Sequence, residues 1–154
     1  MKYLTVNYKN KAYLVKVNNS TFEWASQFRW ILNKGYVYLN IFGLDDQERR
    51  LHRLIMKTKR GQEVDHIDGD PLNNLISNLR IVTRAQNQQN RKLHKNNTSG
   101  FKGVVKTPFG WRAQLRINGK LKYFGHYTTK EVAALAYNEA SKNHFGQYGR
   151  LNQL

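Results

Sequence analysis

Four polar residues in the middle of the chain have types and spacings that could hydrolyse a phosphodiester bond. Asp65 and His66 are adjacent, Asn78 follows a loop-forming stretch, and Asn87 comes nine residues later. If Asp65 ends a strand beside the helix that carries Asn87, their oxygens could hold one magnesium or manganese ion, because hard cations prefer oxygen ligands. His66 could take a proton from water near neutral pH. We expect Asn78 to fix the loop around His66 through hydrogen bonds to backbone groups.

The elements that would position these residues are a strand, a loop, a second strand and a helix. Gly69–Asn74 is rich in turn-forming residues and predicts the loop. Leu79–Val82 is short and rich in branched residues, which favours a strand. Thr83 and Gln86 have the spacing of a capping box, which predicts a helix from about Arg84 to Leu93.

The N-terminal third is predicted to be mainly β-structure. Its apolar and polar residues alternate in three segments, as expected of half-buried strands. The pattern predicts strands at 2–8, 12–17 and 35–42 and a short helix at 21–28, and it leaves 50–56 open between strand and helix.

The C-terminal third is predicted to be a three-stranded antiparallel sheet with one amphipathic helix. Asn118-Gly119 is a strong hairpin signal. A capping box at Thr128 and Glu131 predicts the start of the helix, and Gly146 its end. The expected strands are 103–106, 111–117 and 120–127, and a polar linker at 95–100 precedes them.

The charge of the chain indicates a polyanionic partner, for which nucleic acid is the default. The 154 residues include 26 Lys and Arg against 10 Asp and Glu, a net charge of +16. Twelve basic residues and no acidic one lie between Pro71 and Lys130. The absence of cysteine excludes a disulfide scaffold and a Cys nucleophile. No apolar run could span a membrane and no signal-peptide pattern is present, so we expect a cytoplasmic protein without a membrane partner.

With these residues in view, the segment 52–90 resembles the HNH endonuclease module of phage and intron-encoded homing endonucleases. The likeness rests on LHRLIM (51–56), VDHIDGDPLNNLISNLR (64–80) and TRAQNQQNR (83–91). The resemblance implies a ββα-metal fold with Asp65 and Asn87 as metal ligands, His66 as general base and Asn78 as support for its loop. Asn87 stands where many relatives have a histidine.

The segment 99–152 is similar to the apetala-type DNA-binding domain of plant ethylene-response factors. Gly103-Val104, Trp111-x-Ala113, Phe124-Gly125, the helix AALAY and Arg150-Leu151-Asn152 carry this likeness. The family places the sheet in the DNA major groove with the helix behind it. Strand alternation agrees, because it puts Ala113, Leu115 and Ile117 on the helix side. The residues expected to contact DNA are Lys102, Arg112, Gln114, Arg116 and Tyr123, together with Arg84 of the nuclease helix. Val105, Thr107 and Leu121 fall where plant members often carry arginine, so sequence preference should differ.

These observations predict an α+β protein in four parts: a mostly β N-terminal extension (1–50), a nuclease module (51–94), a linker (95–100) and a DNA-binding domain (101–154). We expect a homing-type endonuclease that hydrolyses double-stranded DNA with one divalent metal, magnesium or manganese. Hydrolysis should leave a 3′-hydroxyl and a 5′-phosphate. One nuclease motif per chain favours nicking by a monomer on DNA, and no protein partner is implied.

Other interpretations remain open from the sequence. The main alternative is a non-catalytic DNA-binding protein or regulator in which the HNH module is only a scaffold. An RNA-binding protein is disfavoured because the sheet offers few exposed aromatic residues for base stacking. Asp68 and Asp70 are interpreted as turn residues and His52 as a structural or orienting residue. A basic sheet face can also be merely solvated.

Overall fold

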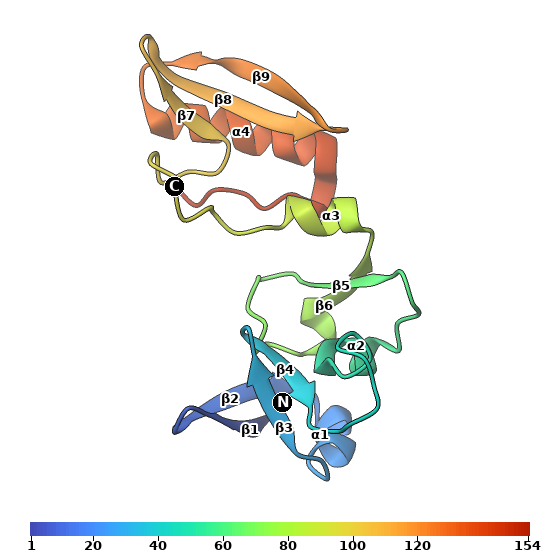
Figure 1. Ribbon diagram of the computed structural model, residues 1–154. Helices are drawn as coiled ribbons and strands as arrows, with labels where there is room; N and C mark the ends of the chain where they lie inside the picture. Colours follow the sequence, from blue (N-terminus) through green and yellow to red (C-terminus); the bar gives the residue numbers. More distant parts are fainter. The chain divides into compact units, whose positions relative to one another are not determined.

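The computed structural model describes residues 1–154 as a mixed α and β protein with short antiparallel sheets. Contacts divide the chain into two compact units, Met1–Asn87 and Gln88–Leu154. Each unit buries its own apolar cluster. Figure 1 follows the elements from the N-terminus to the C-terminus. The polar stretch 95–100 lies inside the second unit, whose contacts begin at Gln88.

The first unit opens with two β-hairpins. Strands β1 (Lys2–Tyr8) and β2 (Lys11–Val17) pair antiparallel over their whole length, which confirms the first two predicted strands. Strands β3 (Trp30–Asn33) and β4 (Tyr36–Leu39) form the second hairpin. Both turns contain residues with positive φ, and Gly35 meets that requirement at the second turn without strain.

Three details of this region differ from the prediction. Strand β3 was not predicted, because its sequence WILN is an apolar run without the alternation that marks a half-buried strand. Of the strand predicted at 35–42, only β4 (Tyr36–Leu39) is present, since the chain turns away after Leu39. The short helix α1 spans Asn19–Ala25 and so begins before the predicted residue 21.

The undecided segment 50–56 contains a helix, α2 (Leu51–Met56), which joins the core of the two hairpins. Leu51 is fully buried in this core, and Leu54 and Ile55 pack against it. An isolated antiparallel bridge between Tyr38 and Arg50 ties the start of α2 to β4. The N-terminal hairpins therefore form one packed body with the segment that leads into the nuclease motif.

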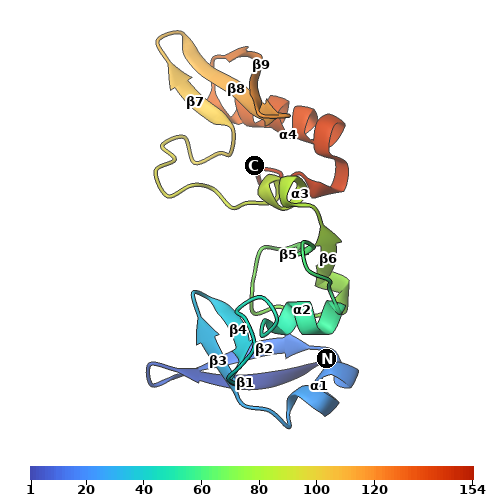
Figure 2. The same ribbon diagram turned by 45° about the vertical axis from the view of Figure 1, so that its right-hand side comes forward.

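The predicted order of strand, loop, strand and helix is present in the first unit (Figure 2). Strands β5 (Glu63–His66) and β6 (Leu79–Val82) pair antiparallel, with Asp65 opposite Arg80. A 3-10 turn, η1 (Ile76–Asn78), precedes β6. Helix α3 (Arg84–Gln89) follows, and reciprocal bonds between Thr83 and Gln86 confirm the predicted capping box.

Helix α3 ends at Gln89 and not at the predicted Leu93. The main-chain carbonyl of Gln89 accepts hydrogen bonds from the Lys102 ammonium and from the Arg150 N–H. The same ammonium also bonds the carbonyl of Arg91. These partners replace the bonds that another helical turn would supply, so the chain leaves the helix at this point.

The second unit is a three-stranded antiparallel sheet with one long helix behind it. The strands are β7 (Val104–Thr107), β8 (Gly110–Ile117) and β9 (Lys120–Tyr127), within a residue or two of those predicted. Helix α4 (Lys130–Phe145) covers one face of the sheet, and the 3-10 turn η2 (Gly146–Tyr148) follows it. Gly103 allows close packing, because a Cβ there would overlap the Tyr137 ring.

The capping box predicted at Thr128 is wrong by one residue. Helix α4 begins at Lys130, and its N-cap is Thr129, whose hydroxyl accepts the N–H of Val132. Gly146 at the other end has a positive φ, which confirms the predicted stop. The Asn118-Gly119 turn also has positive φ at both residues, as the predicted hairpin turn requires.

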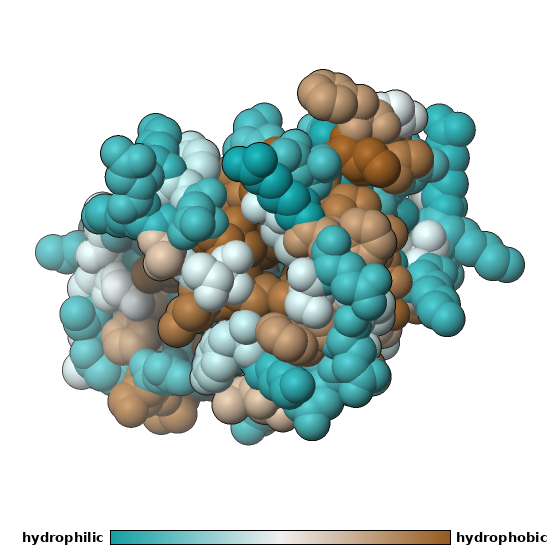
Figure 3. Space-filling model, turned by 90° about the horizontal axis from the view of Figure 1, so that it is seen from below, coloured by the Kyte–Doolittle hydropathy of each residue, from teal (hydrophilic) through white to brown (hydrophobic).

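The surface seen in Figure 3 mixes apolar patches with hydrophilic side chains. In the first unit the exposed large apolar residues include Leu14 on β2 and Phe42 in the segment after β4. No helix in the structure is both long enough and apolar enough to span a bilayer.

The buried position of Leu51 gives a direct test of how α2 stabilises the first unit. We expect Leu51→Ala to lower the free energy of unfolding by about 2–5 kcal/mol, the usual cost of truncating a buried leucine. Leu14→Ala is the matched control, since Leu14 is 58% exposed, and should change it by less than about 0.5 kcal/mol. Urea unfolding followed by tryptophan fluorescence measures both, and equal losses would contradict the assignment of Leu51 to the core.

Candidate active site

His66 is the last residue of β5 and is buried among other rings. Its imidazole makes an edge-to-face contact with His52 of α2, with ring centroids 5.0 Å apart. Tyr36 of β4 lies against both histidines, at 5.6 Å from His52 and 6.2 Å from His66. The second hairpin and α2 therefore fix the direction of the His66 ring.

Both imidazoles are held in the neutral form. Burial, helped by the neighbouring His66 and by the charges of Arg50 and Arg53, lowers the pKa of His52 to about 3. Burial also lowers the pKa of His66, although its hydrogen bond to Asn74 and the neighbouring carboxylates of Asp68, Asp65 and Asp70 oppose this shift. A neutral imidazole at neutral pH is the form that can accept a proton.

Asn74 sets the orientation of the His66 ring from the other side. Its amide nitrogen donates to the Pro71 carbonyl at 3.0 Å, and its Oδ1 therefore faces His66 Nε2, at 3.4 Å. Asn74 is almost fully buried, and its main-chain N–H donates to the Lys16 carbonyl of β2. An acceptor at Nε2 favours the tautomer with the proton there, in which Nδ1 is the nitrogen that takes up a proton.

Asp65 is buried in the middle of β5 and pairs with Arg80 across the β5–β6 ladder. Arg80 Nε and Nη2 lie 2.9 and 2.7 Å from Asp65 Oδ2. The two residues are register partners, so the hairpin itself places the guanidinium beside the carboxylate. This ion pair supplies the countercharge that a buried carboxylate requires.

Asn78 holds the loop between β5 and β6, as the sequence predicts. Its side-chain nitrogen donates to Asp68 Oδ1 and to the Asn73 carbonyl, at 2.9 and 2.8 Å. Its Oδ1 accepts the Asp68 N–H at 3.1 Å, and its main-chain carbonyl accepts the Ile67 N–H. One buried amide thus fixes both ends of the loop that follows His66.

Asp68 and Asp70 serve the loop as turn residues, in line with the sequence. Asp68 accepts bonds from the Asp70 N–H and from the Asn73 and Asn78 amides. Partial burial raises the pKa of the Asp68 carboxyl, but these hydrogen bonds outweigh it and the net shift is downward. Asp70 caps the Leu72 N–H in the same way.

Asn87 lies on α3 and is joined to β5 by a hydrogen bond. Its side-chain nitrogen donates to Glu63 Oε2 at 2.7 Å. Glu63 and Asp65 are two residues apart on one strand, so their side chains leave the same face of β5. The bond from Asn87 to Glu63 therefore ties the start of α3 to the strand that carries Asp65.

The donor chemistry of Asp65 and Asn87 fits a hard divalent cation. A carboxylate and an amide carbonyl are oxygen ligands of the kind magnesium and manganese prefer, and neither cysteine nor a second acid is needed. The structure contains no group of three or more His, Cys, Asp or Glu side chains arranged to hold a metal ion. These two residues could therefore hold a cation only if water or substrate oxygens complete its coordination.

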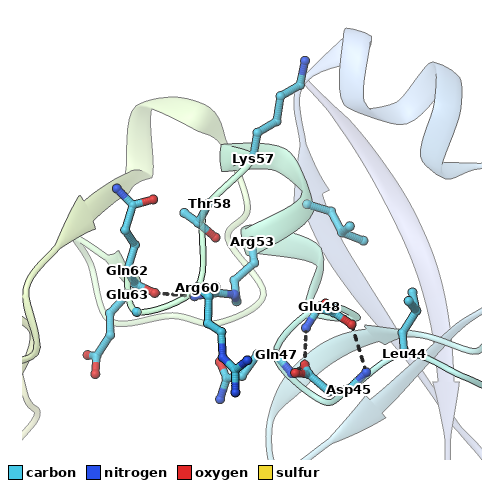
Figure 4. A pocket seen from close by; sticks show the side chains of 12 residues that line it. Leu44, Asp45, Gln47, Glu48, Arg53, Lys57, Thr58, Arg60, Gln62 and Glu63 are labelled. Atoms are coloured by element: carbon cyan, nitrogen blue, oxygen red, sulfur yellow. Dashed lines mark hydrogen bonds between the residues drawn. The ribbon is translucent and has the colours of Figure 1, made fainter.

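A separate open pocket lies beside α2 and the segment that leads into β5 (Figure 4). Arg53 holds this segment by donating to the main-chain carbonyls of Lys59 and Gln62. Glu63 lines the pocket, whereas His66, Asn78 and Asn87 do not. The pocket is therefore adjacent to the candidate site and is not part of it.

In the second unit, four of the residues predicted to contact DNA share one face of the sheet. Arg112 lies over the Tyr123 ring, at 4.4 Å from its centroid, and Gln114 is the register partner of Tyr123. Arg116 is exposed and donates to the Gly119 carbonyl. Ala113 and Leu115 of the same strand are buried toward α4, so the basic side chains lie on the opposite face.

Lys102 and Arg84 lie elsewhere. The Lys102 ammonium is half-buried and bonds the carbonyls of Gln89 and Arg91. Burial, together with the charges of Arg150 and Arg91, lowers the pKa of Lys102 to about 8. Arg84 is exposed at the first position of α3. In this structure Lys102 is thus engaged by the backbone of its own unit.

The residues that surround the predicted site were mostly not found from the sequence. Tyr36, Asn74, Glu63 and Arg80 contact His66, Asp65 or Asn87, and none of these contacts was predicted from the sequence. Only the contact between Arg80 and Asp65 could have been predicted from the sequence, because antiparallel pairing of the two short strands places these residues opposite each other.

Within the segment that carries the predicted site, a strand, a loop held by asparagine side chains, a second strand and a helix follow one another, with Asp65 and His66 buried on the first strand. A sequence model described as HNH endonuclease matches residues 49–89. An uncharacterized HNH endonuclease of Acanthamoeba polyphaga mimivirus is 31% identical over 156 aligned positions, covering 99% of this chain and 81% of that protein. The chain belongs to the HNH endonuclease family.

A second relative, Protein 3.8 of Escherichia phage T7, is 39% identical over 93 residues. The match covers 59% of this chain and 76% of that protein. No solved structure matches the chain. The relatives therefore support a nuclease and identify viral and phage proteins as its kin.

The Asp65–Arg80 pair predicts a large effect on stability. Asp65→Ala should lower the free energy of unfolding by about 3–5 kcal/mol, because it leaves the buried guanidinium of Arg80 without its countercharge. The matched control is Asp46→Ala, which removes an ion pair with Arg49 in which Asp46 is 62% exposed and should cost less than about 1 kcal/mol.

Urea unfolding of both variants tests this prediction. The double variant Asp65→Leu/Arg80→Leu should recover much of the loss, since it removes both buried charges together. If Asp65→Ala cost no more than the exposed control, the pair would not be the buried ion pair described above.

Proposed function

We propose that the chain is a metal-dependent, homing-type endonuclease that hydrolyses phosphodiester bonds in double-stranded DNA. The observation that carries the proposal is a buried, neutral and oriented His66, which follows Asp65 directly and lies with Asn87 in the segment matched to the HNH endonuclease family. The high positive charge of the chain supports a nucleic-acid substrate.

In the proposed reaction His66 acts as the general base. A water molecule beside the imidazole gives its proton to the ring nitrogen and attacks phosphorus, while Asn74 and His52 keep the ring in place. Asn78 keeps the loop after His66 rigid, so that the ring does not move relative to the substrate. The products would carry a 3′-hydroxyl and a 5′-phosphate.

Asp65 and Asn87 would hold the divalent cation, magnesium or manganese. A cation bound there would supply charge stabilisation for the phosphate and the leaving oxygen. Arg80 would stay beside the Asp65 carboxylate and limit the charge it presents. We infer nicking of one strand per event, because each chain carries one His66 centre, and a monomer on DNA suffices for this.

The sheet of the second unit is proposed as the docking surface. The resemblance of 99–152 to the apetala-type domain implies that such a sheet enters the major groove. Arg112, Gln114, Arg116 and Tyr123 line the face away from α4 and could contact bases or phosphates. Lys102 and Arg84 remain proposed contacts with the backbone of DNA.

Replacing the proposed base tests the catalytic function directly. His66→Ala should lower the rate of plasmid nicking at saturating magnesium by about 10²–10⁴-fold, the usual contribution of a general base. His144→Ala, which changes an exposed histidine on α4, should leave the rate unchanged. The rate is followed by conversion of supercoiled to open-circular DNA.

The same plasmid-nicking assay tests whether the activity requires a divalent metal. EDTA should abolish nicking and added magnesium or manganese should restore it. DNA binding without cleavage in either metal would favour the non-catalytic DNA-binding protein instead.

The docking surface predicts a change in salt dependence. The double variant Arg112→Ala/Arg116→Ala should flatten the slope of log affinity against log salt by about 2, since each lost phosphate contact removes about one unit. Lys142→Ala removes an exposed charge from α4 on the other side of the sheet and should leave the slope unchanged. Fluorescence anisotropy with duplex DNA at several salt concentrations measures both, and identical slopes would exclude this face.

A further inference from the structure

We infer that Glu63 is a positioning residue that orients the Asn87 side chain so that its carbonyl oxygen faces the cation. The inference rests on the proposed function, because it concerns how Asn87 would serve as a ligand. Glu63 itself lies outside the set of residues that the sequence singled out.

The first observation is the hydrogen bond between the two side chains. Asn87 Nδ2 donates to Glu63 Oε2 at 2.7 Å, a distance typical of a bond to a charged acceptor. The bond fixes which end of the amide is the nitrogen, and its carbonyl Oδ1 accepts no hydrogen bond from the chain. The amide therefore presents its acceptor end away from Glu63.

The second observation is that Glu63 has no other charged partner. Its cross-strand neighbour is the buried Val82, whereas Asp65 faces Arg80. The only side chain bonded to the Glu63 carboxylate is Asn87. The Glu63 carboxylate, on the same strand face as Asp65, thus has the Asn87 amide as its side-chain partner.

The chemistry of asparagine explains why such a partner matters. An amide has two ends of similar size, but only the oxygen can bind a cation, and an unrestrained amide can rotate between them. The Asn87 backbone is already fixed in the first turn of α3, where its N–H donates to the Thr83 carbonyl at 3.0 Å. The hydrogen bond to Glu63 then restricts rotation of the Asn87 side-chain amide. Residues that hydrogen-bond to metal ligands commonly orient them in this way.

A manganese-binding measurement can tell whether Glu63 acts by orienting the Asn87 amide or by attracting the cation with its own charge. Manganese titration of the full chain without DNA, followed by electron paramagnetic resonance, should show Glu63→Ala binding about 10–100-fold more weakly. Glu63→Gln keeps an acceptor oxygen for the Asn87 amide and should stay much closer to the parent protein. Glu139→Gln, an exposed glutamate on α4, is the matched control and should not differ.

If Glu63→Gln bound manganese as weakly as Glu63→Ala, the carboxylate charge and not the orientation of Asn87 would be responsible, and the inference would be overturned. Circular dichroism and thermal unfolding check that each variant is folded. Glu63→Gln retains the acceptor, so it remains informative even if Glu63→Ala unfolds.

A double-variant cycle tests whether Glu63 acts through Asn87. Adding Glu63→Ala to Asn87→Ala should cause no further loss of manganese affinity, because the amide it orients is already gone. Additive losses would overturn the inference.

A measurement without metal keeps this test separate from the proposed function. In ¹⁵N–¹H spectra, the side-chain amide protons of Asn87 should be shifted by the carboxylate in the parent protein, and this shift should disappear in Glu63→Ala. A parent chain that binds no divalent metal and nicks no DNA overturns both proposals. An active parent with an additive cycle or an unshifted Asn87 amide overturns only the role of Glu63.

Discussion

The position of His66 depends on hydrogen bonds that replace regular secondary structure in the loop after β5. Strands β5 and β6 have four residues each, too few to hold a long connection by their ladder alone. The buried Asn78 and Asn74 side chains instead satisfy backbone groups of the loop, and Asn74 also contacts His66. Because unpaired buried polar groups are costly, this network restricts the loop to one arrangement. The ring direction of His66 follows from that restriction.

The chain as a whole is strongly positive, whereas the histidines of the site are neutral and its buried carboxylate is paired. A net charge of +16 attracts DNA at long range but says nothing about chemistry. At the site, burial keeps His52 and His66 neutral, and Asp65 is the carboxylate balanced by Arg80. The His66 imidazole stays neutral in a strongly basic chain because it is buried against the rings of Tyr36 and His52.

The sequence predicted the elements of this fold better than the contacts between them. Periodicity and turn residues identified β1, β2, the three strands of the second unit and the capping box of α3. Strand β3 escaped because four apolar residues show no period, and α3 ends early because Lys102, remote in sequence, takes its last carbonyl. Local pattern carries no information about such distant partners. The motif residues could be named, but Glu63 and Asn74 could not, since their roles depend on which atoms they meet after folding.

The division into two units affects how the activity can change. The apolar clusters that stabilise the units share no residue. Substitutions that have no common contacts usually act independently. We therefore expect changes at Arg112, Gln114 or Tyr123 on the sheet to leave the Asn78 network around His66 undisturbed. The residues around His66 are less independent of the N-terminal hairpins. They come from β4, α2 and β5, and β4 and α2 also contribute Val37 and Leu51 to the core of those hairpins.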